Sequence, residues 1–278
     1  MTIEKTQINN FKTYLYEEER SKNTIEKYVR DVMHFSLWLK DRALDKSAVL
    51  DYKRALCESF APKSVNSMIS SLNTFFTYTG QLSFKVKTLK IQRQIFLDDD
   101  KELTKEEYNS LLKTAKENDN DRLYYLMQTI GSTGIRISEL SFITVNSVKT
   151  GKANINCKGK MRQVFLPIAL CKMLKTYIKK EKIKNGSVFV TRTGKPINRS
   201  NVWKMLKSLC EKAGVSKKKV FPHNFRHLFA RTFYALKKDI VRLADILGHA
   251  NVNTTRIYTA ETGSSHVKQI QMLGLLRC

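Results

Sequence analysis

Residues 222–227 read Pro222-His223-Asn224-Phe225-Arg226-His227, and two more blocks follow in the same stretch, Leu247-Gly248-His249 and Asn253-Thr254-Thr255-Arg256-Ile257-Tyr258. These types of side chain suit chemistry on a phosphate. A guanidinium binds an oxyanion through two parallel hydrogen bonds, an imidazole transfers protons near neutral pH, and a phenol can act as a nucleophile. The stretch therefore predicts a site that acts on a phosphate group.

A second arginine lies far upstream, in the segment Thr133-Gly134-Ile135-Arg136-Ile137-Ser138-Glu139-Leu140. Together with Arg226, Arg136 can bind the two non-bridging oxygens of one phosphate. Glu139 follows Arg136 by three residues, one helical step. We interpret Glu139 as a structural carboxylate that orients Arg136 rather than as a catalytic acid.

The order and spacing of these blocks resemble the signature of the tyrosine site-specific recombinases, also called the phage-integrase family. The resemblance rests on the His-x-x-Arg-His block, the Leu-Gly-His block and a tyrosine nine residues after that last histidine. It implies that Tyr258 is the nucleophile and that Arg136 and Arg226 bind the scissile phosphate. It also implies that His223 and His249 transfer protons or donate hydrogen bonds. We interpret the other three histidines as ordinary structural or surface residues: His34, His227 and His266. His227 directly follows Arg226 on a predicted helix, so we expect it to point away from the site.

Family members carry a further catalytic residue, a lysine on a β-hairpin turn that is usually written Gly-Lys-Gly. Here the corresponding segment is Cys157-Lys158-Gly159-Lys160, in which the leading glycine is replaced. Alternating residues on both sides of this segment predict a β-hairpin. The resemblance implies that Lys158 is the general acid that protonates the 5′-oxygen leaving group. Lys160 is the alternative, and Lys158 is favoured because Gly159 aligns with the second glycine of the family pattern.

The charge of the chain predicts a polyanionic partner. There are 50 Lys and Arg residues against 25 Asp and Glu, a net charge of +25. Residues 1–100 carry 16 basic and 13 acidic side chains, whereas residues 101–278 carry 34 and 12. Such an excess is an electrostatic footprint for nucleic acid. We favour DNA over a membrane surface because no basic amphipathic helix with a lipid-seeking face is apparent.

The remaining composition indicates a cytoplasmic protein, and the resemblance implies a bacterial one associated with the nucleoid. No apolar run approaches the roughly 18 residues that span a bilayer, and the first ten residues do not resemble a secretion signal. The five cysteines form no Cys-x-x-Cys pair, which favours free thiols over a disulfide scaffold or a zinc site. Neither acidic clusters for two metal ions nor a Gly-rich phosphate loop is apparent. We therefore expect a reaction without metal, ATP or another cofactor.

The periodicity predicts two domains. Residues 1–82 read as a bundle of four helices. One begins at a cap in Asn23-Thr24-Ile25-Glu26, and another, Pro62 to Tyr78, carries an uncharged polar face that is either close to DNA or simply solvated: Ser64, Asn66, Ser67, Ser71 and Asn73. Residues 83–102 read as a linker. Residues 103–278 then begin with a capping box, Thr104 to Glu107, and alternate between helices and the hairpin.

The predicted fold is mostly α-helical with a small β-sheet in the catalytic domain. By resemblance, an all-α SAM-like core-binding domain and a mixed α/β catalytic domain form a C-shaped clamp on duplex DNA. Helical spacing near the C-terminus predicts a tail that packs either on a neighbouring protomer or on its own core: Val267, Ile270, Leu273 and Leu276. The length leaves no room for the arm-binding domain of larger phage integrases.

The resemblance implies strand exchange through a 3′-phosphotyrosine and a Holliday junction, carried out by a homotetramer on two DNA sites. An accessory or directionality protein is a further expected partner. The motifs leave open which outcome the recombination has: integration and excision of a mobile element, inversion, or resolution. Two other classes also remain open, a type IB topoisomerase that relaxes DNA and a non-catalytic DNA-binding protein with the same fold. The motifs predict neither the target sequence nor the cleavage spacing.

Overall fold

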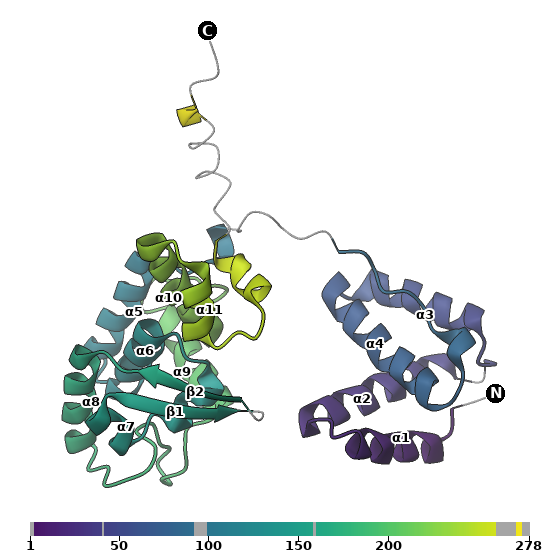
Figure 1. Ribbon diagram of the computed structural model, residues 1–278, viewed down its shortest axis with the longest axis horizontal. Helices are drawn as coiled ribbons and strands as arrows, with labels where there is room; N and C mark the ends of the chain where they lie inside the picture. Colours follow the sequence, from purple (N-terminus) through teal and green to yellow (C-terminus); the bar gives the residue numbers. More distant parts are fainter. Residues whose placement is uncertain (1–2, 41, 92–98, 158–159, 260–270, 274–278) are drawn as a thin grey trace. The chain divides into compact units, whose positions relative to one another are not determined.

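The computed structural model describes residues 3–40, 42–91, 99–157, 160–259 and 271–273. The chain divides into two compact units, Met1–Arg93 and Gln94–Cys278 (Figure 1). Each unit has its own core of buried apolar side chains. Among the described residues, no helix combines the length and apolar character needed to cross a membrane.

The first unit is a bundle of four helices, as predicted: α1 (Lys5–Glu17), α2 (Lys22–Leu39), α3 (Lys46–Ser59) and α4 (Pro62–Tyr78). A short 3₁₀ helix, η1 (Leu82–Phe84), follows. The predicted cap of α2 is wrong by two residues, because the Ser21 hydroxyl accepts from the Thr24 amide and starts the helix earlier. His34 is structural, as expected, and its Nδ1 lies 2.6 Å from the Tyr52 hydroxyl.

The uncharged face of α4 serves the fold of the first unit. The Asn66 side chain bonds to both the amide and the carbonyl of Leu89, at 2.7 and 2.9 Å, and Asn73 does the same with Val86, at 3.0 and 2.9 Å. Ser71 is fully buried and donates to Asp31. Both interpretations of this face, contact with DNA and simple solvation, are therefore wrong for Asn66, Ser71 and Asn73. The segment 84–89, which we predicted as linker, packs on the first core instead.

The second unit is built mainly from helices, and the predicted capping box is confirmed where Thr104 and Glu107 start α5. Its elements before the sheet are η2 (Asp99–Lys101), α5 (Lys105–Glu117), α6 (Asp121–Thr133), η3 (Ile137–Phe142) and α7 (Val145–Thr150). Those after the sheet are α8 (Ile168–Lys180), α9 (Arg199–Cys210), α10 (Pro222–Lys237), α11 (Ile240–Leu247) and η4 (Val252–Tyr258). The sequence did not predict α7 or η4, which have only six and seven residues.

The predicted hairpin is confirmed. Strands β1 (Lys152–Cys157) and β2 (Lys160–Phe165) pair antiparallel, with Cys157 opposite Lys160. Ala153, Ile155 and Val164 are buried, whereas Phe165 is exposed, so one face of the hairpin covers the core. The turn at Lys158 and Gly159 lies outside the described residues, and so do Val267, Ile270 and Leu276 of the predicted tail. Leu273 is described and is exposed.

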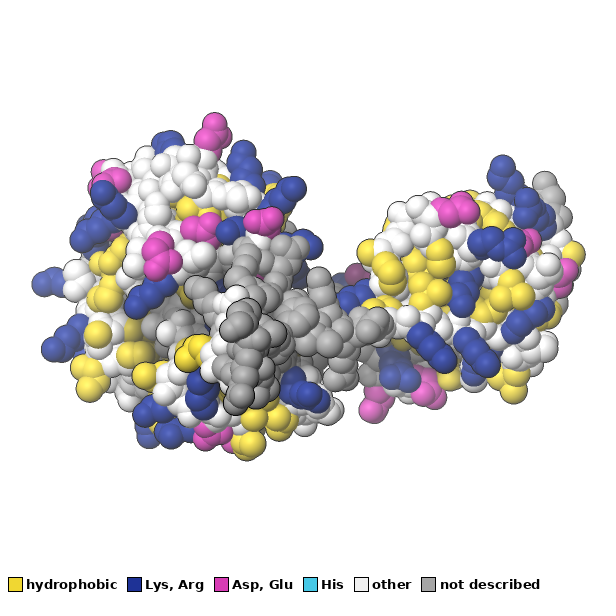
Figure 2. Space-filling model, turned by 90° about the horizontal axis from the view of Figure 1, so that it is seen from above, with side chains coloured by type: hydrophobic (Ala, Val, Ile, Leu, Met, Phe, Trp, Pro, Cys, Tyr) yellow, Lys and Arg dark blue, Asp and Glu magenta, His cyan; other side chains and the backbone are white. Residues whose placement is uncertain are grey.

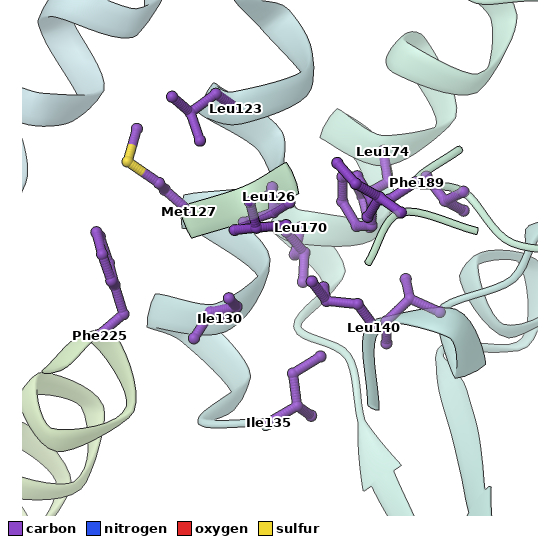
Figure 3. Close-up of a cluster of buried hydrophobic side chains, with 14 of the residues drawn as sticks. Leu123, Leu126, Met127, Ile130, Ile135, Leu140, Leu170, Leu174, Phe189 and Phe225 are labelled. Atoms are coloured by element: carbon purple, nitrogen blue, oxygen red, sulfur yellow. The ribbon is translucent and has the colours of Figure 1, made fainter. Parts of the chain in front are cut away.

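Helix α6 supplies much of the core of the second unit. Leu123, Leu126, Met127 and Ile130 of this helix are buried among side chains from η3, α8 and α10 (Figure 3). Phe225 is the side chain from α10 and is fully buried. Its burial fixes the rotation of α10, and the rotation in turn sets where the next residue, Arg226, points.

Candidate active site

Arg226 joins the ends of three helices. Pro222 occupies the first turn of α10, where its missing amide hydrogen has no intrahelical partner to lose. The Arg226 side chain is only 1% exposed and donates to the carbonyls of Gly134 and Leu247, both at 2.7 Å. These carbonyls lie at the C-terminal ends of α6 and α11, where helices leave acceptors unsatisfied. Arg226 therefore links the ends of α6 and α11 to the start of α10.

His249 lies directly beyond α11. Gly248 ends that helix in the left-handed conformation, and the His249 amide donates back to the Ala244 carbonyl at 2.9 Å. The His249 Nε2 lies 3.0 Å from the Arg226 guanidinium, which has donors only, so Nε2 must accept. Nδ1 therefore carries the proton and donates to the buried Thr255 hydroxyl at 2.8 Å. Both ring nitrogens of His249 therefore have a hydrogen-bond partner.

Arg136 lies at the start of η3 and is held by Glu139. Its amide and its guanidinium donate to the two oxygens of the Glu139 carboxylate, at 2.7 and 3.1 Å. Glu139 is buried, and a third donor reaches it from β2, the Arg162 guanidinium at 2.7 Å. Arg162 also donates to the Ile246 carbonyl of α11. The expected orienting role of Glu139 fits this geometry, and Arg162 links it to the hairpin.

Tyr258 lies in η4 with only 4% of its surface exposed. Its ring packs in an apolar cluster with Ala230, Leu243 and Leu247. The His249 ring is stacked on it with centroids 6.1 Å apart, and the His227 ring meets it nearly perpendicularly at 5.0 Å. Burial raises the pKa of the Tyr258 phenol, and the positive charges of Arg226 and Arg136 oppose that rise. The tyrosine is therefore protonated at neutral pH in the DNA-free chain.

His223 and His249 are both poor bases. Burial lowers the pKa of His249 to about 4, and the charges of Arg226 and Arg136 act in the same direction. The pKa of His223 is also lowered to about 4, by desolvation first and then by the charges of His227, Arg226 and Arg136. The His223 ring itself is exposed on α10. In the DNA-free chain both rings are therefore neutral at pH 7.

The expectation that His227 points away from the site is wrong. His227 follows His223 by four residues on α10, so the two rings lie on one helix face, with centroids 4.5 Å apart. His227 Nδ1 lies 3.5 Å from the Glu102 carboxylate, and its Nε2 is buried. Burial would raise the pKa of Glu102, but the hydrogen bond to His227 and the charge of Arg231 lower it below its usual value.

The structure thus brings five of the six predicted site residues into one cluster: Arg136, His223, Arg226, His249 and Tyr258. Lys158 lies outside the described residues, although the strands on either side of it are described. Sequence reasoning missed four neighbours of this cluster: Glu102, Arg162, His227 and Thr255. The helical spacing of His223 and His227 could have revealed one of them, and Thr255 precedes Tyr258 by one 3₁₀ turn. Glu102 and Arg162 carried no such signal.

Comparison with known proteins shows the family to which the chain belongs. Residues 101–264 match the Phage integrase family, and residues 8–80 match the Phage integrase N-terminal SAM-like domain. The chain therefore belongs to the phage integrase family and is a tyrosine recombinase, an enzyme that transfers DNA strands in site-specific recombination.

Within this class the chain is similar to Xer recombinases over nearly its whole length. It is 29% identical to tyrosine recombinase XerA of Pyrococcus furiosus, covering 96% of this chain and 93% of that protein. It is 27% identical to tyrosine recombinase XerD of Halalkalibacterium halodurans, covering 91% and 93%. A structure of lambda integrase residues 75–356, a dimer bound to a COC′ core site, has the same fold, with a TM-score of 0.75, 15% identity and coverage of 93% and 95%.

Proposed function

We propose that Tyr258 attacks the scissile phosphate of a specific DNA site while Arg136 and Arg226 bind its two non-bridging oxygens. The attack forms a 3′-phosphotyrosine and releases a 5′-hydroxyl. The observation that carries this proposal is the contact of one buried tyrosine with the cluster of Arg226 and His249. Such an ester keeps the energy of the phosphodiester bond, so a second 5′-hydroxyl can reverse the step on a new partner.

Arg136 and Arg226 stabilise the negative charge that develops on the phosphate. Burial and the nearby charge of Arg136 lower the pKa of Arg226 to about 10, so Arg226 stays protonated at neutral pH. Its Nε is buried and has no hydrogen-bond partner among the described residues. A phosphate oxygen could supply the missing acceptor. Preorganised donors of this kind stabilise the charge that develops in the transition state more than they stabilise the ground state.

The leaving oxygen needs an acid, and we assign that role to Lys158. Strand β1 ends at Cys157 and β2 begins at Lys160, so the two described strands flank Lys158 in the sequence. Arg162 of β2 donates to Glu139 and to the Ile246 carbonyl near the end of α11. Lys158 adjoins a hairpin that Arg162 links to the segments that carry Arg136 and His249. This link supports a role for Lys158 at the same phosphate.

Complete recombination requires two duplexes and two rounds of strand exchange, so we propose a homotetramer that passes through a Holliday junction. A solved structure of lambda integrase, TM-score 0.73 and 15% identity, is a tetramer bound to a Holliday junction. The basic surface supports binding of duplex DNA by both units: Figure 2 shows Lys and Arg side chains spread over the visible face of each, with fewer acidic ones. We propose that the reaction takes place on DNA in the cytoplasm.

The extents of the two units and the family matches support a division of labour. We propose that the first unit binds DNA beside the cleavage point and that the second carries out the chemistry.

The proposal is tested by recovering DNA that remains covalently attached to the protein after SDS treatment of cells that express it. The wild type should yield adducts on DNA 3′ ends at one recurring sequence, whereas Tyr258→Phe should yield none. The variant should still bind a duplex of that sequence, since a phenylalanine fits the apolar cluster around residue 258. Adducts in Tyr258→Phe would overturn the assignment of the nucleophile. Relaxation of supercoiled plasmid without the recurring site would favour a topoisomerase instead.

A further inference from the structure

His227 has one buried ring nitrogen beside the cluster of site residues. Its ring is mostly buried between His223 and Tyr258, and Nδ1 faces the Glu102 carboxylate. With Nδ1 donating to a carboxylate, Nε2 of the neutral ring is an acceptor. That nitrogen is buried and has no hydrogen-bond partner among the residues that the structure describes. An unpaired buried acceptor is costly, so its presence beside the nucleophile asks for an explanation.

Glu102 also lies beside a second basic group, Arg231. One of its oxygens lies 3.3 Å from the Arg231 guanidinium, and the same guanidinium donates to the Leu103 carbonyl at 2.8 Å. The lowered pKa of Glu102 keeps the carboxylate ionised at neutral pH. An ionised carboxylate stabilises positive charge on an imidazole that it contacts. Glu102 is therefore placed to stabilise His227 when that ring gains a proton.

The other two histidines of the cluster are less suited to gain one. His249 uses Nε2 to accept from Arg226 and Nδ1 to donate to Thr255, so neither nitrogen is free. His223 is an exposed residue, and the Glu102 carboxylate contacts the His227 ring rather than the His223 ring in the ion pairs of the described residues. The arginines that bind a phosphate oppose a further positive charge on either ring.

We propose that His227, supported by Glu102, accepts the phenolic proton of Tyr258 during cleavage. The O–H bond of Tyr258 breaks and an Nε2–H bond forms on His227, while the phenolate oxygen bonds to phosphorus and the bond from phosphorus to the 5′-oxygen breaks. The acid that we assign to Lys158 protonates that 5′-oxygen. On religation each transfer runs backwards. This inference rests on the proposed role of Tyr258 and adds the destination of its proton.

The charged and titratable groups that face His227 come from two helices and from the segment before α5. Glu102 precedes α5, His223 and Arg231 lie one turn before and after His227 on α10, and Tyr258 comes from η4. Only Glu102 among them is an anion at neutral pH. Its replacement should therefore change the pH dependence of cleavage, whereas a role of His227 in packing alone should leave that dependence unchanged.

The test measures single-turnover cleavage of a nicked suicide duplex that carries the recurring site. His227→Gln keeps a polar side chain of similar reach but cannot take up a proton, and general-base loss of this kind slows reactions by roughly 10² to 10⁴-fold. Replacing Tyr258 by a polyfluorinated tyrosine, whose phenol is more acidic, should restore much of the rate in His227→Gln. A packing defect would not respond to the acidity of the phenol.

His223→Gln is the matched control, because it alters the neighbouring ring on the same helix face. Its defect should remain when the fluorinated tyrosine is present. A substrate with a sulfur leaving group at the 5′-position, which needs no acid, should also fail to restore His227→Gln. Rescue of His223→Gln in place of His227→Gln would overturn the inference, and so would cleavage by His227→Gln at the wild-type rate.

Glu102→Gln provides a second variant in case His227→Gln does not fold. It leaves the imidazole in place but removes the carboxylate, so the maximal rate should fall and the acidic limb of the pH profile should move to lower pH. An unchanged limb would contradict the inference. Cleavage by Tyr258→Phe would instead contradict the proposed role of Tyr258 as the nucleophile. Failure of that proposal is therefore distinguished from failure of the inference about His227.

Discussion

The Glu139 carboxylate and the Arg162 guanidinium lie 2.7 Å apart and connect the hairpin to the segment that carries Arg136. Glu139 is 2% exposed and receives three hydrogen bonds, two of them from Arg136. Removing one member of a buried ion pair leaves an uncompensated charge, whereas the complete pair is close to neutral for stability. The pair therefore matters for geometry: it fixes Arg136 relative to the strand that leads from Lys158.

Arg162→Met should accordingly lower stability and cleavage together. We expect a loss of about 3 kcal/mol in the free energy of unfolding, because Glu139 keeps its charge with one donor fewer. The double variant Glu139→Leu/Arg162→Met should be less destabilised than the sum of the two single variants, since contacting residues couple by about 0.5–3 kcal/mol. Urea unfolding followed by Trp203 fluorescence in a Trp38→Phe background reports on the second unit. The exposed Met161→Ala in the same strand is the control, and strictly additive losses would contradict the coupling.

Arg226→Lys should fail although it keeps the charge. The compact ammonium of lysine does not reproduce the planar fork with which the guanidinium bonds to Gly134, Leu247 and His249. Unsatisfied buried carbonyls cost about 1–3 kcal/mol each, so the midpoint of unfolding should fall. Loss of one preorganised charge contact should slow cleavage by about 10²- to 10³-fold. Arg192→Lys, at an exposed arginine of the same unit, should leave the unfolding midpoint and the cleavage rate at wild-type values.

The sequence predicted most helices of both units because burial of one face imposes a 3.6-residue period, visible in α4 and α8. It also predicted the site residues that were assigned from the spacing of the motifs, and the structure brings the described ones together. Two short elements, α7 and η4, escaped because one or two turns give too little periodicity. The polar face of α4 was misinterpreted because Asn66 and Asn73 bond to a segment that looked like linker.

The residues missed around the site share a physical cause. Glu102 and Arg162 come from segments without periodicity and reach the cluster only through the tertiary fold, so local spacing cannot place them. His227 is different, because its position four residues after His223 already put both on one face of α10. We predicted its direction from its adjacency to Arg226 alone. Arg226 and His227 lie three and four residues after His223, however, and residues at these spacings share a helix face.

Acid should destabilise the second unit through its histidines. The pKa of His249 is about 4 in the folded chain, below the usual value near 6.5, so the unfolded chain binds more protons between these two pH values. Stability is therefore lost as pH falls from about 6.5 towards 4, and His223 acts in the same direction. Thermal unfolding between pH 7 and 4.5 should show a falling Tm. His249→Gln, which can still accept from Arg226, should make that fall shallower, and an identical slope would contradict the assignment.

Gly248→Ala should perturb the site through Arg162. Gly248 has φ +66°, and a Cβ there would lie 2.4 Å from the Cδ of Arg162, whose guanidinium is held by Glu139 and Ile246. Gly151 is the matched control, since it ends α7 at φ +73° and a Cβ there would meet no atom within 4 Å. Alanine in this conformation costs about 1–2 kcal/mol at either position. The excess loss in Gly248→Ala over Gly151→Ala measures the displacement of Arg162, and cleavage should fall only in Gly248→Ala. Equal losses of stability with unchanged cleavage would show that Arg162 moves aside without disturbing Arg136.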